Sequence, residues 1–317
     1  MRIGVMLGPE RGRYSTKVER LRADARWAED AGLTTAWIPQ IPDDFDALTA
    51  VAIVGAETTR LEIGTAVVPV QPRHPIALAQ QALSVQAICN GRLRLGLGVS
   101  HHWIIDEMLG LPYEQPVADM RAHLDVLDAA LAGPGMVDVE NDTFRVHNPL
   151  DITDVTPTPV LLAALGPVML RLAGERTDGT ILWMADERAI GDHIAPTITH
   201  AAERAGRKAP RIVAGIPVCL CRDDEVDVAV ARTNRILAEA ETSPNYQRLL
   251  ERGDAREVGD LLAAGSESSI EKRMRAFADA GATDLSVRVV AIGEGREERI
   301  ASLKRTREYL ASLTGEL

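Results

Sequence analysis

Apolar positions along this chain follow two alternating patterns. Eight short runs rich in aliphatic and β-branched residues begin at Ile3, Thr35, Leu61, Leu93, Val160, Thr180, Ile212 and Asp284. Runs of this length and composition predict buried β-strands. Between most of them the apolar positions recur every three to four residues. This spacing predicts amphipathic helices over residues 17–31, 116–132, 186–205, 224–240, 267–280 and 294–313, with another starting at His74-Pro75.

Glycine marks the end of two predicted helices in the same way. Ala31-Gly32-Leu33-Thr34 and Ala280-Gly281-Ala282-Thr283 each lead from a helix into a strand. Glycine just past a helix end supplies the left-handed conformation that closes the helix. Eight strands separated by helices predict an α/β fold, a (β/α)8 TIM barrel.

The alternative architecture is a doubly wound open sheet that binds a dinucleotide. Such a sheet would carry a Gly-x-Gly-x-x-Gly turn after an early strand. The nearest string is Gly96-Leu97-Gly98-Val99-Ser100-His101, where His101 takes the place of the third glycine. The barrel is therefore favoured.

Two stretches of the chain are longer than the connections that a minimal barrel requires. Residues 133–158 are rich in Gly, Pro and Asp around a strand-like Phe144-Arg145-Val146, and residues 241–266 form a polar, charged connection. We expect both as insertions in loops that follow strands, where they serve either as lids or substrate walls or as plain surface loops. Because no separate linker interrupts the chain, we expect one domain over residues 1–317.

The composition narrows the possible partners. The chain is 46% hydrophobic but has only four Trp, four Tyr and three Phe, so its core must be mainly aliphatic, as in helices packed on a parallel sheet. Its 35 basic and 46 acidic residues give a net charge of −11, which argues against a nucleic-acid or anionic membrane surface. An odd number of cysteines, and the lack of an apolar run of about 20 residues, favour a reduced, cytoplasmic protein.

Catalytic and binding residues are expected at the carboxyl ends of the strands, because α/β barrels carry their active sites there. After the fourth strand, Ser100-His101-His102 offers a hydroxyl and two imidazoles, of which at most one faces a given ligand. Gly98-Val99-Ser100-His101-His102 lacks the second glycine of a hydrolase nucleophile elbow. The chain has no His-Glu-x-x-His motif or dense carboxylate–imidazole cluster, so no metal site is expected.

A second candidate is Gly166-Pro167, after the fifth strand. This pair predicts either a tight turn or a helix start whose free N–H groups suit a phosphate. Without a conventional nucleophile or metal site, we expect a bound cofactor to supply the chemistry.

Several strings, in order along nearly the whole chain, resemble the bacterial-luciferase-like superfamily. They are Leu61-Glu62-Ile63-Gly64-Thr65-Ala66-Val67-Val68-Pro69, Asn90-Gly91-Arg92-Leu93-Arg94-Leu95-Gly96-Leu97-Gly98 and Leu162-Ala163-Ala164-Leu165-Gly166-Pro167. Within that superfamily the chain looks most like oxidoreductases that use the deazaflavin coenzyme F420. The resemblance implies a barrel with a flavin-like ring at its carboxyl-terminal mouth.

The resemblance also implies how this ring is held. A bulge after the third strand, often with a cis peptide, supports the back of the ring, the loop after the fourth strand lies along the cofactor side chain, and backbone N–H groups after the fifth strand bind the phosphate. The matching cofactor-binding residues are Ala66, Val67, Val99, Ser100, His101, Ala164, Leu165, Gly166 and Met169.

One position departs from the family pattern. Many deazaflavin relatives have an Asp-His pair after the second strand, where this chain has Pro39-Gln40. Gln40 can hydrogen-bond the ring or substrate but cannot act as an acid at neutral pH, so His101 or His102 is the best candidate for acid–base catalysis. Three tryptophans near strand ends either wall the substrate pocket or pack in the core: Trp37, Trp103 and Trp183.

Three functions fit the resemblance. The first is an F420-dependent oxidoreductase that transfers a hydride between the deazaflavin and an organic small molecule. The second is an FMN-dependent monooxygenase that works with a partner reductase, and the third is a flavin- or deazaflavin-binding barrel without catalysis. Such barrels usually dimerise, and the helix over residues 75–89 offers small residues for a homodimer contact: Ala77, Ala79, Ala82 and Ala87.

Overall fold

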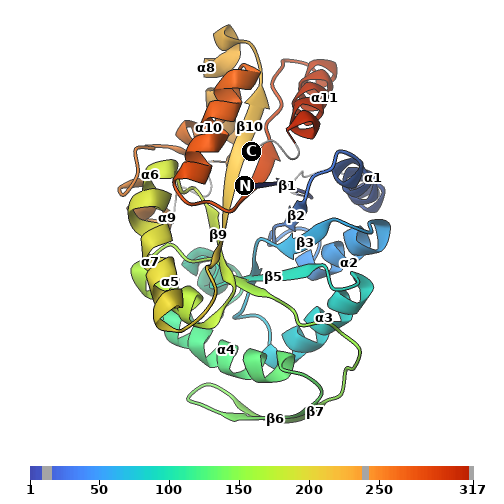
Figure 1. The fold of residues 1–317 in the computed structure, drawn as a ribbon, viewed down its shortest axis with the longest axis vertical. Helices are drawn as coiled ribbons and strands as arrows, with labels where there is room; N and C mark the ends of the chain where they lie inside the picture. Colours follow the sequence, from blue (N-terminus) through green and yellow to red (C-terminus); the bar gives the residue numbers. More distant parts are fainter. Residues whose placement is uncertain (9–15, 238–242, 314–317) are drawn as a thin grey trace.

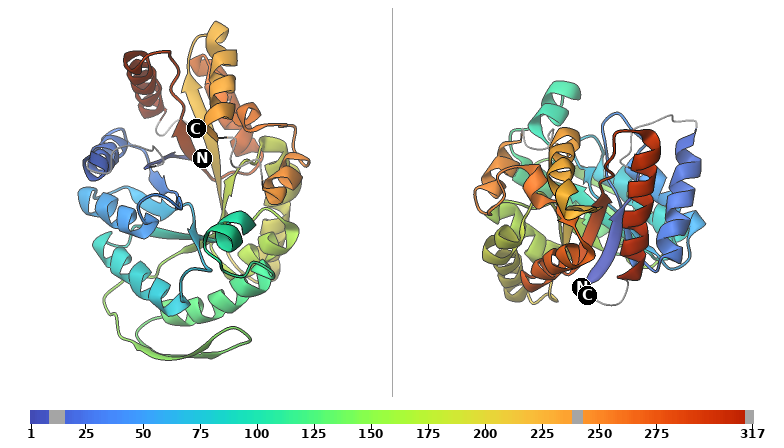
Figure 2. Two further views of the ribbon diagram at one scale, coloured as in Figure 1. Left: turned by 180° about the vertical axis from the view of Figure 1, so that it is seen from behind. Right: turned by 90° about the horizontal axis from the view of Figure 1, so that it is seen from above.

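Eight parallel strands close into a barrel surrounded by helices in a computed structural model that describes residues 1–8, 16–237 and 243–313 (Figures 1 and 2). In ring order the strands are β1 (Arg2–Met6), β2 (Thr35–Ile38), β3 (Glu62–Thr65), β5 (Leu93–Gly98), β8 (Val160–Leu162), β9 (Gly179–Trp183), β10 (Arg211–Leu220) and β12 (Asp284–Val289). The ring closes where β9 pairs with β10. Each strand begins within one residue of its predicted start, which confirms the predicted TIM barrel.

The outer layer consists of helices that run back between the strands. The α-helices are α1 (Lys17–Asp30), α2 (Ala47–Glu57), α3 (Pro75–Ile88), α4 (Pro116–Leu131), α5 (Pro167–Arg176), α6 (Glu187–Ala189), α7 (Ala195–Arg204), α8 (Val226–Leu237), α9 (Pro244–Leu250), α10 (Glu267–Asp279) and α11 (Arg296–Ser312). Short η segments cover Trp103–Met108 (η2), Ile190–Ile194 (η3), Asp223–Glu225 (η4) and Val258–Leu261 (η6). No helix in the described ranges is long and apolar enough to cross a membrane.

Helix α2 was absent from the sequence prediction. Its residues are almost all apolar, so they form no polar stripe from which a helical period could be recognised. Asp46 is the N-cap of this helix, and its carboxylate accepts a hydrogen bond of 2.9 Å from the Thr49 backbone N–H. Burial against neighbouring elements, rather than amphipathic spacing, therefore accounts for this helix.

The two insertions lie on different sides of the barrel. Residues 135–150 form an antiparallel hairpin of β6 (Gly135–Glu140) and β7 (Arg145–Leu150). This hairpin connects α4 to β8 and projects beside α4, so the expectation that it follows a strand was wrong (Figure 1). The described part of residues 241–266 does lie in the loop that follows β10. It contains α9, η6 and the short strand β11 (Ala263–Gly265).

Helix α3 keeps only part of the small-residue face proposed for a homodimer contact. Ala79 and Ala82 are fully buried within the subunit, whereas Ala77 and Ala87 are exposed. A homodimer through this helix would therefore use its exposed residues alone.

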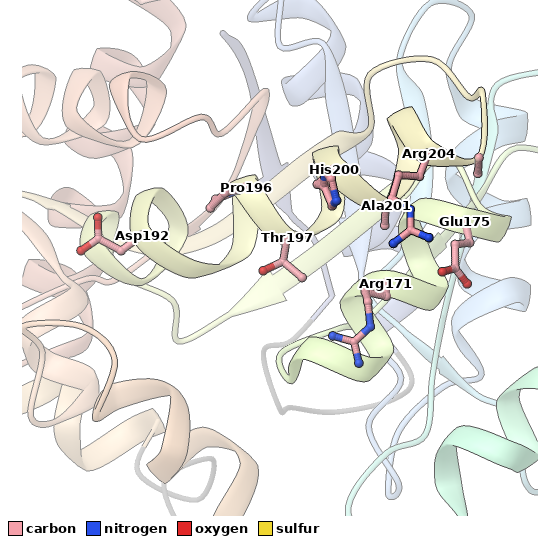
Figure 3. Close-up of a pocket in the computed structure, with 9 residues that line it drawn as sticks. Arg171, Glu175, Asp192, Pro196, Thr197, His200, Ala201 and Arg204 are labelled. Atoms are coloured by element: carbon pink, nitrogen blue, oxygen red, sulfur yellow. The ribbon is translucent and has the colours of Figure 1, made fainter.

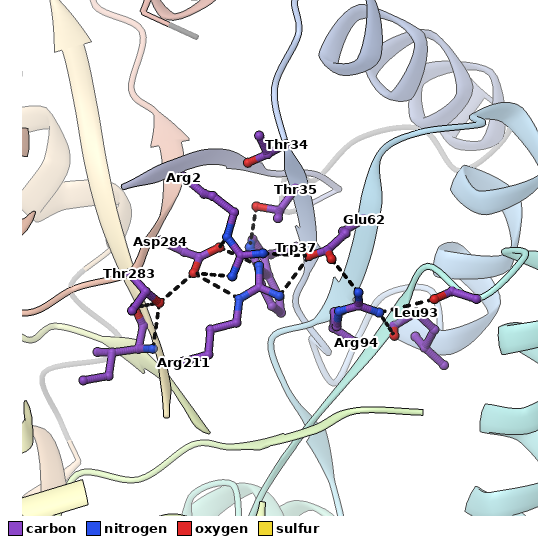
Figure 4. A network of polar contacts seen from close by, with 12 residues as sticks. Arg2, Thr34, Thr35, Trp37, Glu62, Leu93, Arg94, Arg211, Thr283 and Asp284 are labelled. Carbon is purple, nitrogen blue, oxygen red and sulfur yellow. Dashed lines mark hydrogen bonds and ion pairs between the residues drawn. The ribbon is translucent and has the colours of Figure 1, made fainter. Parts of the chain in front are cut away.

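Buried charges close the barrel at the amino ends of its strands (Figure 4). The Arg211 guanidinium contacts Asp284 at 2.5 Å and Glu62 at 2.9 Å. Arg2 pairs with both of these carboxylates, and Arg94 pairs with Glu62. The Asp284 side chain is wholly buried. Burial lowers the pKa of Arg211, but the hydrogen bonds and charges of Asp284 and Glu62 outweigh it, so this pKa lies above its ordinary value.

Trp37 fills the lumen directly above these charges. Its side chain is fully buried, its indole Nε1 donates to Thr35 Oγ1 at 3.0 Å, and the Arg211 guanidinium lies 5.4 Å from the ring centroid. On β3, Gly64 makes room for the ring, because a Cβ there would lie 2.2 Å from Trp37 Cζ3. Trp37 therefore packs in the core, which was one of its two expected roles.

Replacing Asp284 should test how far the fold depends on this network. We expect Asp284→Ala to lower the free energy of unfolding by about 3 kcal/mol, because Arg211 stays buried with Glu62 as its remaining partner. Urea denaturation followed by circular dichroism measures this change. Asp224→Ala, which removes an exposed partner of Arg222, is the matched control and should leave the midpoint unchanged. Equal stability of the Asp284 variant and the wild type would contradict the assigned role.

Candidate functional site

Glycine and small side chains line the carboxyl ends of the barrel strands. A Cβ at Gly98, the last residue of β5, would lie 2.6 Å from Val67 Cγ2, and one at Gly215 in β10 would lie 2.7 Å from the Trp183 ring. The peptide between Ala66 and Val67, in the bulge between β3 and β4 (Val68–Pro69), is cis, as expected from the family pattern. Val67 and Trp183 thus pack over the two glycines at this mouth.

The loop after β5 is held by hydrogen bonds to its backbone. Gln71 Nε2 donates to the Val99 carbonyl at 2.8 Å, and the Tyr113 hydroxyl donates to the Ser100 carbonyl at 3.0 Å. Ser100 has a φ of +57°, in the left-handed backbone region that residues other than glycine rarely adopt. This bend directs the chain from the strand end to His101.

His101 forms an aromatic cluster with Trp103 and Tyr246. The His101 and Trp103 rings are nearly parallel, at 8°, with centroids 5.8 Å apart, and the Tyr246 ring lies 5.5 Å from His101. His101 Nδ1 and Trp103 Nε1 are both buried and have no hydrogen-bond partner in the described residues. His102 points elsewhere, half-exposed, with Nε2 3.8 Å from Glu107. Only His101 of the two neighbours is turned into the cluster.

The cluster carries no charge at neutral pH. Burial, and secondarily the charge of His102, lowers the pKa of His101 below its ordinary 6.5, so the imidazole is neutral at pH 7. Burial raises the pKa of Tyr246 to about 12, so its phenol keeps the proton. The two side chains can therefore bind a neutral polar group through hydrogen bonds.

Gln40 is partly engaged by the fold. Its Oε1 accepts a hydrogen bond of 2.9 Å from the backbone N–H of Ala47, the first residue of α2. Its amide nitrogen is the group left to donate to a ligand.

The turn after β8 leads directly into α5. Gly166 is the N-cap of this ten-residue helix and has no side-chain cap, and Pro167 is its first residue. The first N–H groups of an α-helix have no intrahelical acceptor, so they suit an anion. His193 Nε2 lies 2.9 Å from the Leu165 carbonyl and holds the turn, while Ala164 and Met169 are buried beneath it.

Asp186, after β9, ties the second insertion to the mouth of the barrel. Its buried carboxylate caps α6 through the Ala189 N–H at 2.8 Å. It also accepts hydrogen bonds from the backbone N–H groups of Asp254, at 2.6 Å, and Ala255, at 2.9 Å. Half-buried Trp183 packs with Tyr246 against the apolar side of the insertion. No local sequence pattern indicated Asp186 or Tyr246, because their contacts join distant parts of the chain.

A separate groove lies between α5 and α7, on the outer layer of helices (Figure 3). Its volume is about 690 Å³, and Arg171, Thr197, His200 and Arg204 are among its lining residues. None of the residues predicted for the site lines it. In the described part of the chain, no group of three His, Cys, Asp or Glu side chains is placed to hold a metal ion.

Comparison with known proteins shows the family to which the chain belongs. The family model for luciferase-like monooxygenases matches residues 1–301. A putative coenzyme F420-dependent oxidoreductase of Mycobacterium tuberculosis is 28% identical over 193 residues, which cover 56% of this chain and 55% of that protein.

Two solved structures share the fold over almost the whole chain. Coenzyme F420 dependent tetrahydromethanopterin reductase from Methanopyrus kandleri has a TM-score of 0.74 at 19% identity, covering 100% of this chain and 98% of that one. The FMN-bound oxygenating constituent of 3,6-diketocamphane monooxygenase from Pseudomonas putida has a TM-score of 0.76 at 17% identity, covering 98% and 97%. The same architecture thus occurs with either cofactor.

The ionisation of His101 should respond to its neighbour. We expect His102→Asn to raise the pKa of His101, because a nearby positive charge is removed, but to leave it below 6.5, because burial is the larger cause. An NMR titration of the imidazole C–H signals measures both values. His200→Asn, an exposed change on α7, should not alter the titration of His101. A His101 that titrates above 6.5 in the wild type would refute the buried, neutral imidazole.

Proposed function

Because this chain belongs to the luciferase-like monooxygenase family, we propose that it is an oxidoreductase that uses coenzyme F420 to transfer a hydride to or from an organic small molecule. The observation that carries this proposal is the pair of buried, unpartnered nitrogens, His101 Nδ1 and Trp103 Nε1, beside a strand end. Buried polar groups normally have partners, so this pair fits a bound ligand. Similarity to the putative coenzyme F420-dependent oxidoreductase of Mycobacterium tuberculosis supports the choice of F420 as cofactor.

The residues at the mouth fit a deazaflavin. Ala66 and Val67 would support the ring, and the loop of Val99 and Ser100 would hold the cofactor side chain. The free N–H groups at the start of α5 would bind the phosphate. These contacts involve mostly backbone atoms, which suits a turn without a side-chain cap.

The protein's own contribution is to orient the substrate and manage one proton. When bound, a deazaflavin supplies or accepts a hydride at ring C5. Oxidation of an alcohol by loss of a hydride also releases the hydroxyl proton, which a neutral imidazole can accept and the amide of Gln40 cannot. His101 is the better candidate of the two histidines, because it is turned into the cluster while His102 is half-exposed. Rings around this position exclude water from the reacting groups.

A second candidate function is an FMN-dependent monooxygenase that works with a partner reductase. The structural similarity to the FMN-bound constituent of 3,6-diketocamphane monooxygenase favours it. A barrel that binds the cofactor without catalysis is the third. In each case we propose a cytoplasmic protein that acts on, or binds, a small molecule.

Cofactor titration separates these functions. Binding of either cofactor should quench tryptophan fluorescence, because Trp103 and Trp183 lie near the proposed ring site. We expect F420 to do so at lower concentrations than FMN. Fluorescence titration and equilibrium dialysis measure both dissociation constants. Tight FMN binding without F420 binding would overturn the first proposal. Tight F420 binding without hydride exchange across a panel of alcohols and ketones would favour the non-catalytic barrel.

A carboxylate at the start of α5 tests the phosphate position. Val168, 43% exposed in the first turn, can be changed to Asp, whose charge would occupy the free N–H groups and repel a phosphate. We expect Val168→Asp to weaken cofactor binding roughly tenfold or more. Val228→Asp, in the first turn of α8, is the matched control and should bind as the wild type does. Unchanged binding by the Val168 variant would place the phosphate elsewhere.

A further inference from the structure

The second insertion places a tyrosine beside the loop that follows β5. Tyr246 belongs to α9, in the loop that follows β10, yet its ring contacts His101 after β5. The backbone hydrogen bonds from Asp254 and Ala255 to buried Asp186 attach the insertion to the end of β9. The position of Tyr246 is therefore fixed by contacts with the rim and is not that of a free surface loop.

Two arginines add to this attachment. Arg188 contacts Asp254 at 2.8 Å, and Arg273 of α10, which pairs with Glu187 at 2.9 Å, donates to the Leu262 carbonyl at 3.2 Å. Apolar packing adds to them, because Tyr246 and Trp183 lie against the buried cluster of Met184, Leu237, Leu250, Ala255, Val258 and Leu261. A side chain held in this way can bind a ligand with little loss of conformational entropy.

The polar groups of this aromatic cluster lack partners, whereas those of Tyr309, Tyr113 and Trp37 have them. Tyr309 donates to the Glu267 carbonyl at 2.9 Å, Tyr113 donates to the Ser100 carbonyl, and Trp37 donates to Thr35. Within the described ranges His101 Nδ1 and Trp103 Nε1 are buried without a hydrogen-bond partner. The Tyr246 hydroxyl makes no hydrogen bond to the described residues. Three polar atoms on three touching or stacked rings thus remain available.

We propose that Trp103, His101 and Tyr246 form a substrate-recognition site that binds the oxygen of a planar, conjugated carbonyl compound. An indole N–H can only donate, and a phenol that keeps its proton donates readily, so the matching ligand atom is an acceptor such as a carbonyl oxygen. The rings offer faces and edges on which a flat molecule packs better than a puckered one. This assignment rests on the proposed function only in placing the substrate beside a bound cofactor. The three side chains can bind the carbonyl oxygen without a cofactor present.

Two ketones that differ only in the planarity of their ring test the assignment. Acetophenone and 1-cyclohexylethanone present the same methyl ketone on an aromatic or a saturated ring. The protein, labelled with ¹⁵N at its four tryptophan indoles, is titrated with each ketone, first without cofactor and then with F420. Trp103→Phe identifies the Trp103 indole signal by its absence.

We expect acetophenone to shift the Trp103 indole N–H signal and to bind more tightly than 1-cyclohexylethanone. Tyr246→Phe should weaken acetophenone binding about three- to tenfold, because one hydrogen bond is lost. The matched control, Tyr309→Phe, removes a hydroxyl that is bonded elsewhere and should bind acetophenone as the wild type does.

Three results would overturn the assignment: a Trp103 signal that does not move at saturating acetophenone, equal affinity for the two ketones, or a Tyr246→Phe variant that binds as tightly as the wild type. The titration without cofactor separates this inference from the proposed function. If F420 fails to bind while the Trp103 shift and the Tyr246 effect persist, the recognition site stands and the cofactor assignment falls.

Discussion

The buried ion pairs among Arg211, Asp284 and Glu62 are the interaction on which the rest of the barrel depends. They neutralise charges that would otherwise be prohibitively costly inside a narrow lumen, and Trp37 packs directly on them. The amino end of the lumen is thus filled by side chains (Figure 4). The ligand site that we propose lies at the opposite end, where glycines and the bulge at Ala66 and Val67 shape the mouth.

Much of the fold was predictable because its strands are short aliphatic runs. Their spacing, and the glycines that end the helices before them, can be recognised from neighbouring residues alone. The cis peptide at Ala66–Val67 was predictable from family resemblance. Helix α2 was not, because its residues are apolar on every side. Tyr246 and Asp186 were missed for another reason. Their roles arise from contacts such as that between Asp186 and Asp254, 68 residues apart, which no local pattern encodes.

The choice between F420 and FMN is difficult for a physical reason. The residues proposed to hold the cofactor do so mainly through backbone groups, at the start of α5 and after β5, and backbone groups leave no side-chain signature. Gln40 replaces the histidine of many deazaflavin relatives and is partly used to start α2. The aromatic cluster of neutral His101, Trp103 and Tyr246 does present side-chain groups, and we propose that these bind the substrate rather than the cofactor.

A crystal structure of the protein with F420 tests the central claim most directly. The account predicts the deazaflavin ring at the carboxyl ends of the strands, in front of Ala66 and Val67, with its phosphate at the first turn of α5. One ring face should be open toward His101, Trp103 and Tyr246. A cofactor bound in the outer groove between α5 and α7, or a mouth without cofactor at saturating concentration, would contradict the account.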